Sequence, residues 1–300
     1  MVEPAPFETL DRLSCLELRS HGLPSGVVPR LYALARRGDP LCLQAAAALA
    51  ADSARRVAFF TGIVHEKQPR GELDGPIGCA VLAAALTRLE REAFVFAPAD
   101  VVPVLAAVRD VCGGGFAVMP DTEADPAAFD AAVSIERLGR NRKGVHHSIF
   151  GVPRDQSPVA DDFFETLDES GRLTIGIGDG GNEIGFGSIF SAARRVVPRG
   201  RACGCPCGGG IVTTTRARYL LVASVSNFGA YAVSAALALL TGTPELAPRP
   251  QTVVGAMAAA VEAGGIDGGS MIPGRVADDG IAADAVAAVV TLMRATVENA

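Results

Sequence analysis

Short apolar runs and stretches of helical periodicity alternate along most of this 300-residue chain. Runs that suit buried strands lie at residues 56–61, 94–97, 131–135, 173–177 and 219–225. Stretches with helical spacing of apolar residues lie at residues 41–54, 77–89, 102–111, 161–169, 229–240 and 276–297. This alternation is typical of a parallel sheet covered by helices. The pattern predicts a single α/β domain over residues 1–300, a doubly wound, mostly parallel sheet in a Rossmann-like three-layer fold, with helices on both faces.

The composition supports a large core built from small side chains. Hydrophobic residues make up 49% of the chain and charged residues 20%, which excludes a disordered protein. Aromatic residues make up only 5%, and there is no Trp. Ala, Val, Leu and Gly must therefore fill the interior, as they do where helices pack closely on a parallel sheet.

Charge and hydropathy narrow the list of partners and compartments. The net charge of −6 provides no basic surface for nucleic acid. Residues 219–244 carry no charge, but Ser224, Asn227 and Thr241 interrupt them, so a buried strand and a capped helix explain them better than a membrane span. The acidic N-terminal stretch is unlike a secretory signal. We expect a soluble, cytoplasmic protein that contacts neither membrane nor nucleic acid. Whether it forms a homo-oligomer is left open.

The strongest chemical signal is a glycine-rich acidic turn at residues 176–187, directly after a predicted strand. Successive N–H groups in such a turn form a concavity that binds anions. Asp179, Asn182 and Glu183 lie within it, and a turn with a purely structural role does not require two carboxylates and an amide there. We therefore predict these three as catalytic residues. The predicted ligand-binding glycines of the turn are Gly178, Gly180 and Gly181.

The same turn also fits the dinucleotide pattern G-x-G-x-x-G at residues 176–181. That pattern expects an acidic residue about 20 positions later for the ribose. None occurs between Glu183 and Glu245, although Arg199 and Arg201 are available for a 2′-phosphate. Two carboxylates in the turn would repel a pyrophosphate, which disfavours the dinucleotide interpretation. Because the two arginines are available, an NADP-dependent Rossmann oxidoreductase is kept as the alternative.

Other polar turns follow the remaining strands. Because the carboxyl ends of parallel strands share one edge, we expect these turns to form one pocket in which at least one carboxyl has a raised pKa. Asp74 and Asn227 also suit helix caps. The predicted binding residues in these turns are Asp74, Gly75, Glu136, Ser226, Asn227 and Asp267.

Cysteine and histidine residues form a second group of candidates. The seven cysteines do not resemble a secreted disulfide framework. Cys203, Cys205 and Cys207 are separated by single residues, unlike the wider gaps of zinc chelates, and this spacing argues against a metal or redox role. The adjacent His146 and His147 are candidates for a ligand or a base.

Taken together, the motifs resemble the C-terminal domain of the D-glutamate cyclase family. The residues that carry the resemblance are Thr61-Gly62, Glu72-Leu-Asp-Gly-Pro76, Ile135 to Arg140, Ile177 to Gly185, Ser226 to Gly229 and Gly265 to Gly268. They cover nearly the whole chain. Leu73, Phe186 and Phe228 depart from the family pattern, and Leu73 removes an expected hydroxyl from the site.

The resemblance implies a hydro-lyase that cyclises D-glutamate to 5-oxo-D-proline, or acts on a related small anionic amino acid. It requires no organic cofactor. Glu183 or Asp179 would accept a proton, the N–H groups of residues 178–181 would receive an oxyanion, and Mg²⁺ or Mn²⁺ would be held by Asp179, Asp74 and Asp267. A non-catalytic small-anion-binding protein is a further alternative. The candidates for binding the substrate α-carboxylate are Arg194, Arg195, Arg199, Arg201, Arg216 and Arg218.

Overall fold

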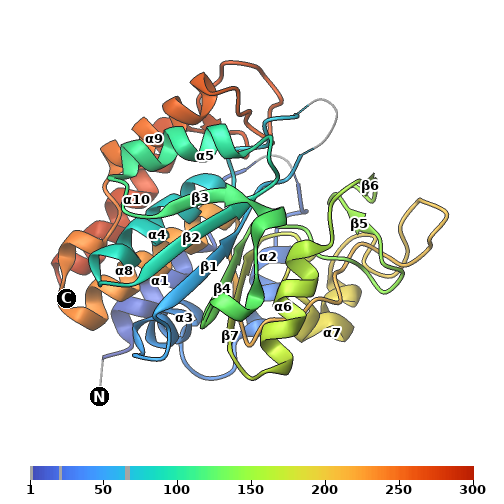
Figure 1. Cartoon of the computed structure of the whole chain (residues 1–300), viewed down its shortest axis with the longest axis horizontal. Helices are drawn as coiled ribbons and strands as arrows, with labels where there is room; N and C mark the ends of the chain where they lie inside the picture. Colours follow the sequence, from blue (N-terminus) through green and yellow to red (C-terminus); the bar gives the residue numbers. More distant parts are fainter. Residues whose placement is uncertain (1–2, 20–21, 65–67) are drawn as a thin grey trace.

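A six-stranded parallel sheet forms the centre of the molecule (Figure 1). The computed structural model describes residues 3–19, 22–64 and 68–300. The strand order is β3-β2-β1-β4-β7-β8. Successive strands are added toward one edge of the sheet from β1 to β3 and toward the other edge from β4 to β8, so the direction of winding reverses between β1 and β4. This arrangement confirms the doubly wound α/β fold, and it is the order found in dinucleotide-binding folds. The strands are β1 (Arg56–Phe60), β2 (Glu92–Ala97), β3 (Ala117–Pro120), β4 (Ala131–Ile135), β7 (Leu173–Gly178) and β8 (Tyr219–Val222).

Ten α-helices are found in the described residues, together with two short antiparallel hairpins, β5–β6 and β9–β10. The helices are α1 (Ala5–Ser14), α2 (Val27–Ala35), α3 (Leu41–Ala50), α4 (Pro76–Arg88), α5 (Val102–Cys112), α6 (Val159–Glu169), α7 (Phe190–Val196), α8 (Ser226–Thr241), α9 (Pro250–Glu262) and α10 (Ala283–Glu298). The hairpin strands are β5 (His146–His147), β6 (Pro153–Arg154), β9 (Ala277–Asp278) and β10 (Ile281–Ala282). Short 3₁₀ turns occur at Asp121–Glu123, Pro126–Ala128, Gly187–Ile189 and Pro244–Leu246.

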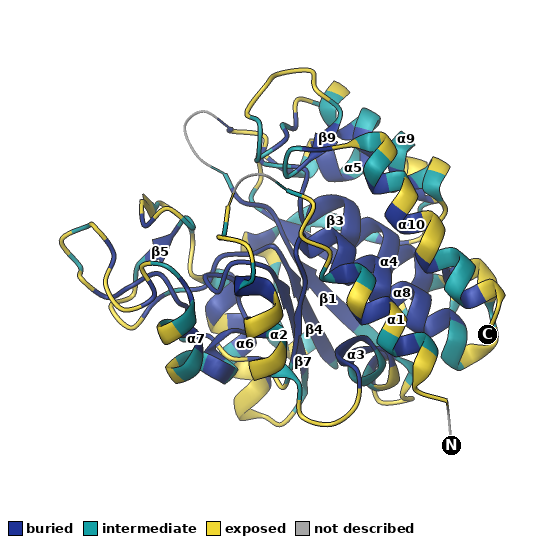
Figure 2. Ribbon diagram, turned by 180° about the vertical axis from the view of Figure 1, so that it is seen from behind, coloured by how far each residue is buried: buried dark blue, intermediate teal, exposed yellow. Residues whose placement is uncertain are grey.

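Helices α4 and α8 cover one face of the sheet, and they are buried along most of their length (Figure 2). Their contact is close because Gly78 faces α8: a Cβ there would lie 2.8 Å from the Cβ of Ala230. Helices α1, α3, α5, α9 and α10 pack outside this pair. Small residues therefore bring the N-termini of α4 and α8 together at the sheet edge, where the site is built.

Helix α6 covers the opposite face, and a cluster of phenylalanine side chains lies beneath it. Phe60 and Phe96 of the sheet contact Phe163 of α6 and Phe129, with a ring-centroid separation of 4.7 Å between Phe60 and Phe163. The two faces of the sheet are thus filled differently, with alanine-rich helices on one side and phenyl rings on the other.

Most predicted elements agree with the structure to within a few residues, and the predicted strand at residues 131–135 is β4 itself. The prediction of a helix over residues 276–297 was wrong at its start, because β9 and β10 precede α10. Asp279 and Gly280 have φ angles of 50° and 80°, as a two-residue hairpin turn requires. The uncharged residues 219–244 hold β8 and α8, and no described helix is long and apolar enough to cross a membrane.

Candidate functional site

A cavity of about 450 Å³ opens at the carboxyl ends of the central strands. Glu136, directly after β4, and Asp179, directly after β7, form its floor. Residues 148–150 of the β5–β6 hairpin form one wall, and residues 268–271 form another. This is the position, beside the point where the winding reverses, at which doubly wound folds bind their ligands.

Carboxylates dominate the cavity and its surroundings. Oxygen atoms of Asp74, Glu136 and Asp179 lie within 4.8 Å of one another. Arg19 is the nearest compensating cation, and it pairs with Asp179 and, at 2.5 Å, with Asp279. The acidic cluster, as we call it below, comprises Glu72, Asp74, Glu136, Asp179, Glu183, Asp278 and Asp279.

Burial and mutual repulsion raise the pKa values of most of these carboxyls. Burial is the main cause for Glu136, and the charges of Asp179 and Glu183 raise its pKa further. Burial likewise raises the pKa of Asp179, although Arg19 opposes the shift. Burial and the neighbouring Asp279 raise the pKa of Asp278 to about 8. The expectation of at least one raised carboxyl pKa is confirmed, and at neutral pH the cluster must keep protons or bind cations.

The glycine-rich turn folds around the side chain of Glu183. The N–H groups of Gly180 and Gly181 donate to Glu183 Oε2 at 3.1 and 2.9 Å. A Cβ at Gly178 would lie 2.8 Å from that same oxygen, so a larger residue would displace the carboxylate. These N–H groups are therefore not free for an oxyanion, contrary to our expectation.

The same geometry weakens the dinucleotide interpretation. The N–H groups that would hold a pyrophosphate are already bonded to Glu183. The glycine pattern also follows β7, whereas the dinucleotide fingerprint follows the first strand of the fold. Asn182, in the same turn, lines the cavity; its amide nitrogen donates to the carbonyl of His147 at 3.0 Å, and its Oδ1 has no partner among the described residues.

Asp74 and Asn227 cap each other's helices. Asp74 accepts from the N–H groups of Ser226 and Asn227 at 3.0 and 2.7 Å, at the start of α8. Asn227 Oδ1 accepts from the N–H groups of Gly75 and Gly78 at 3.0 and 2.6 Å, at the start of α4. Asn227 does not line the cavity, and its amide nitrogen donates to Leu73 and Asp278. The exchange fixes the acidic cluster relative to both helices.

Glu136 is held in a strained conformation. Its φ angle is 47°, in the left-handed region that few non-glycine residues adopt. The hydroxyl of Ser226 donates to its carboxylate, and Gly75 packs against it so closely that a Cβ there would lie 2.8 Å from the Cβ of Glu136. Met271 and Asp279, which also line the cavity, have positive φ angles of 56° and 50°. Strain of this kind concentrates at functional sites.

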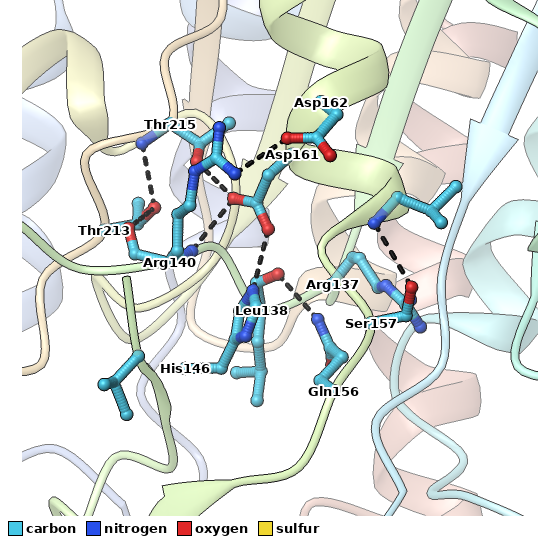
Figure 3. Close-up of polar contacts among 12 residues, drawn as sticks. Arg137, Leu138, Arg140, His146, Gln156, Ser157, Asp161, Asp162, Thr213 and Thr215 are labelled. Carbon is cyan, nitrogen blue, oxygen red and sulfur yellow. Dashed lines mark hydrogen bonds and ion pairs between the residues drawn. The ribbon is translucent and has the colours of Figure 1, made fainter. Parts of the chain in front are cut away.

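Three other candidates do not line the cavity. Asp267 accepts N–H bonds from Gly269, Ser270 and Gly280, so it supports the cavity wall from behind and is not part of the group of three close carboxylates. His146 bonds Asp161 at 2.7 Å, in a network with Thr215 and Arg140 beneath α6 (Figure 3). His147 points its ring at the cysteines instead.

The sequence analysis missed several cavity residues. All six arginines proposed for the α-carboxylate are described, and none lines this cavity, whereas Arg19 and Arg154 do. Glu72 and Asp279 also line it, and Asp278 lies behind them. The Asp279-Gly280 pair is a hairpin signal that could have identified the second acidic turn. No local pattern marks Arg19 or Arg154.

Comparison with known proteins identifies relatives of the chain. A family model described as "D-glutamate cyclase-like, C-terminal" matches residues 33–294. A human protein named "D-glutamate cyclase, mitochondrial" is 29% identical over 226 aligned residues, which cover 65% of this chain and 34% of that protein. The chain therefore spans about a third of the length of this relative.

Proposed function

The chain belongs to the D-glutamate cyclase-like C-terminal family, and from this premise we propose that it cyclises D-glutamate to 5-oxo-D-proline. The reaction joins the amine nitrogen to the carbon of the γ-carboxylate (Cδ) and releases one oxygen of that carboxylate as water. Two protons must leave the nitrogen, and two must reach the departing oxygen. The observation that carries the proposal is the acidic cluster, which places carboxyls of different environment around one cavity of suitable size.

Glu183 is the base in this proposal. Burial raises its pKa, while its bonds from the N–H groups of Gly180 and Gly181 favour the ionised form. It lines the cavity, and only one of its oxygens is engaged by those two groups. It therefore accepts a proton from the substrate ammonium, which frees the nitrogen lone pair. Asn182 Oδ1, which has no partner among the described residues, orients the amine.

Glu136 is the acid. Burial, Asp179 and Glu183 all raise its pKa, and no described cation pairs with it. It therefore keeps its proton at neutral pH and gives it to the departing oxygen. The second nitrogen proton returns to Glu136 and the proton on Glu183 passes to the same oxygen, so both carboxyls end as they began.

Arg154 binds the substrate α-carboxylate. It lines the cavity from β6 and makes no ion pair with a described carboxylate, whereas Arg19 is already neutralised by Asp179 and Asp279. A guanidinium forms two parallel bonds to a carboxylate, which fixes the orientation of the substrate. Binding both ends of a folded D-glutamate brings the nitrogen close to the carbon of the γ-carboxylate.

The acidic cluster also fits a divalent cation. Asp74 and Asp179 offer hard oxygen ligands, which suit Mg²⁺ or Mn²⁺ better than Zn²⁺. Glu136 lies beside them but keeps its proton as the acid, and Asp267, which the sequence analysis added to the ligands, lies outside this group. A cation there would lower the repulsion among the carboxylates and polarise the γ-carboxylate of the substrate.

The decisive experiment incubates the full chain with D-glutamate, L-glutamate and other D-amino acids and follows lactam formation by chiral chromatography and mass spectrometry. The proposal expects 5-oxo-D-proline from D-glutamate. Lactam from another amino acid alone would make the chain a related hydro-lyase. Binding of D-glutamate in calorimetry without turnover would make it a small-anion-binding protein.

A second arm of the experiment tests the cation. The chain is treated with a chelator and then given Mg²⁺ or Mn²⁺. We expect the loss of turnover on chelation and its recovery with either ion. Full turnover after chelation, with neither ion found by elemental analysis, would remove the cation from the proposal.

A further inference from the structure

Three cysteines and one histidine point at a common centre outside the acidic cluster. The Sγ atoms of Cys203, Cys205 and Cys207 lie 3.2–3.3 Å from one another. Nε2 of His147 lies 3.2 Å from Cys205 Sγ and 3.7 Å from Cys207 Sγ. All four atoms lie within 4.8 Å of each other. We call this group the Cys₃His cluster.

The orientation of His147 is that of a metal ligand. Its side chain is fully buried, and its Nδ1 lies 3.1 Å from the carbonyl oxygen of Val145. A carbonyl oxygen only accepts, so Nδ1 carries the proton and Nε2 presents a lone pair to the sulfurs. A backbone carbonyl that fixes the tautomer in this way is the usual outer partner of a metal-bound histidine.

The loop of residues 203–209, which we call the cysteine loop, is surrounded by hydrogen-bond donors that favour thiolates. The N–H of Gly209 and the amide of Asn141 lie 3.4 and 3.5 Å from Cys207 Sγ and donate to it. Thiolates are the form in which cysteine binds metal.

A disulfide explains the cluster less well. The sulfurs of a disulfide are about 2.0 Å apart, and a pair would leave the third cysteine and the histidine without a role. Four zinc ligands at Zn–S distances of about 2.3 Å place their sulfurs about 3.8 Å apart, so the thiols need to spread by about half an ångström. The one-residue spacing of the cysteines argued against zinc when they were considered alone. In the structure, His147 comes from a separate segment and supplies the fourth ligand.

We propose that the Cys₃His cluster is a structural zinc site. Three thiolates and an imidazole are a ligand set that selects Zn²⁺, and four protein ligands complete its tetrahedron without an open position for substrate. The site is thus chemically distinct from the oxygen-rich acidic cluster.

The proposed zinc braces the wall of the cavity. Asn182 of the glycine-rich turn donates to the carbonyl of His147, and residues 148–150 line the cavity immediately after it. On the other side, the cysteine loop leads to Thr213, whose N–H donates to the carbonyl of Gly181 at 3.1 Å. The cysteine loop lies beside β5 at one end of the molecule (Figure 1). One ion therefore ties the loop to both sides of the glycine-rich turn.

The first test is the metal content of the full chain, purified without a histidine tag. We expect one equivalent of zinc per chain by elemental analysis. Cys205→Ser, which removes the sulfur in contact with the other three ligands, should reduce zinc to background, whereas the control Cys15→Ser should retain it. Zinc at background in the unaltered chain, or retained in Cys205→Ser, would overturn the proposal.

A second test does not depend on the folding of a variant. The unaltered chain, stripped of metal and loaded with Co²⁺, should show the strong visible absorption of tetrahedral cobalt and a sulfur-to-cobalt charge-transfer band. The absence of both bands would contradict the site. So would an intact mass lower by two hydrogens, because it would show a disulfide instead. None of these readings depends on cyclase activity.

Discussion

The side chain of Glu183 stabilises its own turn and is also the base in the proposed reaction. Its carboxylate occupies the N–H concavity of its own turn and also faces the cavity. The two N–H bonds to Oε2 hold the carboxylate in a defined position, and its other oxygen is the one that they leave available to a proton. Asp179, four residues earlier in the same turn, is instead paired with Arg19 and is less free to exchange a proton.

Replacing Glu183 with Gln should therefore remove the base without disturbing the turn. The Gln carbonyl oxygen still accepts from Gly180 and Gly181, but it cannot take a proton from the substrate. We expect turnover of D-glutamate to fall about 10²–10⁴-fold with little change in the free energy of unfolding. Glu169→Gln, at the exposed end of α6, is the matched control. Turnover within threefold of the unaltered chain would show that Glu183 is not the base.

Arg154→Met tests substrate recognition at the same scale. Losing a charged bidentate contact costs about 1.5–3 kcal/mol, which corresponds to a rise of about 10–150-fold in KM for D-glutamate. Steady-state kinetics should show a smaller change in kcat, because Arg154 contacts the α-carboxylate and not the reacting atoms. Arg30→Met, an exposed change on α2, provides the control. An unchanged KM would exclude Arg154 from binding.

At the scale of elements, the N-termini of α4 and α8 form one unit. The close approach at Gly78 allows a single side chain, Asn227, to cap α4 from α8, while Asp74 caps α8 from the turn before α4. The caps also position Ser226, whose hydroxyl contacts Glu136. The geometry of the acidic cluster therefore depends on how these two helices pack.

Asn227→Ala should destabilise the fold substantially. It leaves the buried N–H of Gly78 without an acceptor, removes one of the two acceptors of the Gly75 N–H, and removes a donor to Asp278. The expected loss in the free energy of unfolding is about 2–4 kcal/mol in urea denaturation. Asn299→Ala, an exposed change beyond α10, should cost less than about 0.5 kcal/mol. Equal effects of the two changes would show that the reciprocal caps carry little stability.

For the whole molecule, the acidic cluster makes stability depend on pH. The folded chain binds a proton at Asp278 up to a pKa of about 8, whereas the unfolded chain releases it near the ordinary value of 3.8. The contribution of this proton is present below pH 4 and is lost as the pH rises to about 8. Asp279 and Asp267 add to the repulsion around Asp278, while Asn227 and Arg19 oppose it. The unliganded protein should therefore be less stable at pH 8 than at pH 5.

Asp278→Asn should flatten this dependence. A neutral amide oxygen still accepts from Asn227, and no proton is lost as the pH rises. We expect the fall in the free energy of unfolding between pH 5 and pH 8 to be about 2–4 kcal/mol smaller than in the unaltered chain. Urea denaturation at three pH values measures it, with the exposed Asp284→Asn as control. Parallel curves for Asp278→Asn and the unaltered chain would contradict the assignment.

The sequence by itself determined the fold class and the centre of the site. Strand β4 and the turn with Asp179 and Glu183 are local features: burial sets the apolar runs, and the backbone of the turn requires glycine. The position of Glu136 at the end of its strand follows from the same reasoning. Parallel strands bring their carboxyl ends to one edge, so the meeting of these acids at one cavity was also implied by the sequence.

Only the tertiary structure decided which distant side chains complete the site. Arg19 reaches Asp179 across 160 positions, and His147 meets Cys205 across 58, contacts that no local spacing encodes. The structure also turned Asp267 toward backbone N–H groups and left Glu136 beside Asp74. Which way a side chain turns depends on the competing partners that packing brings near it, and those partners come from other segments of the chain.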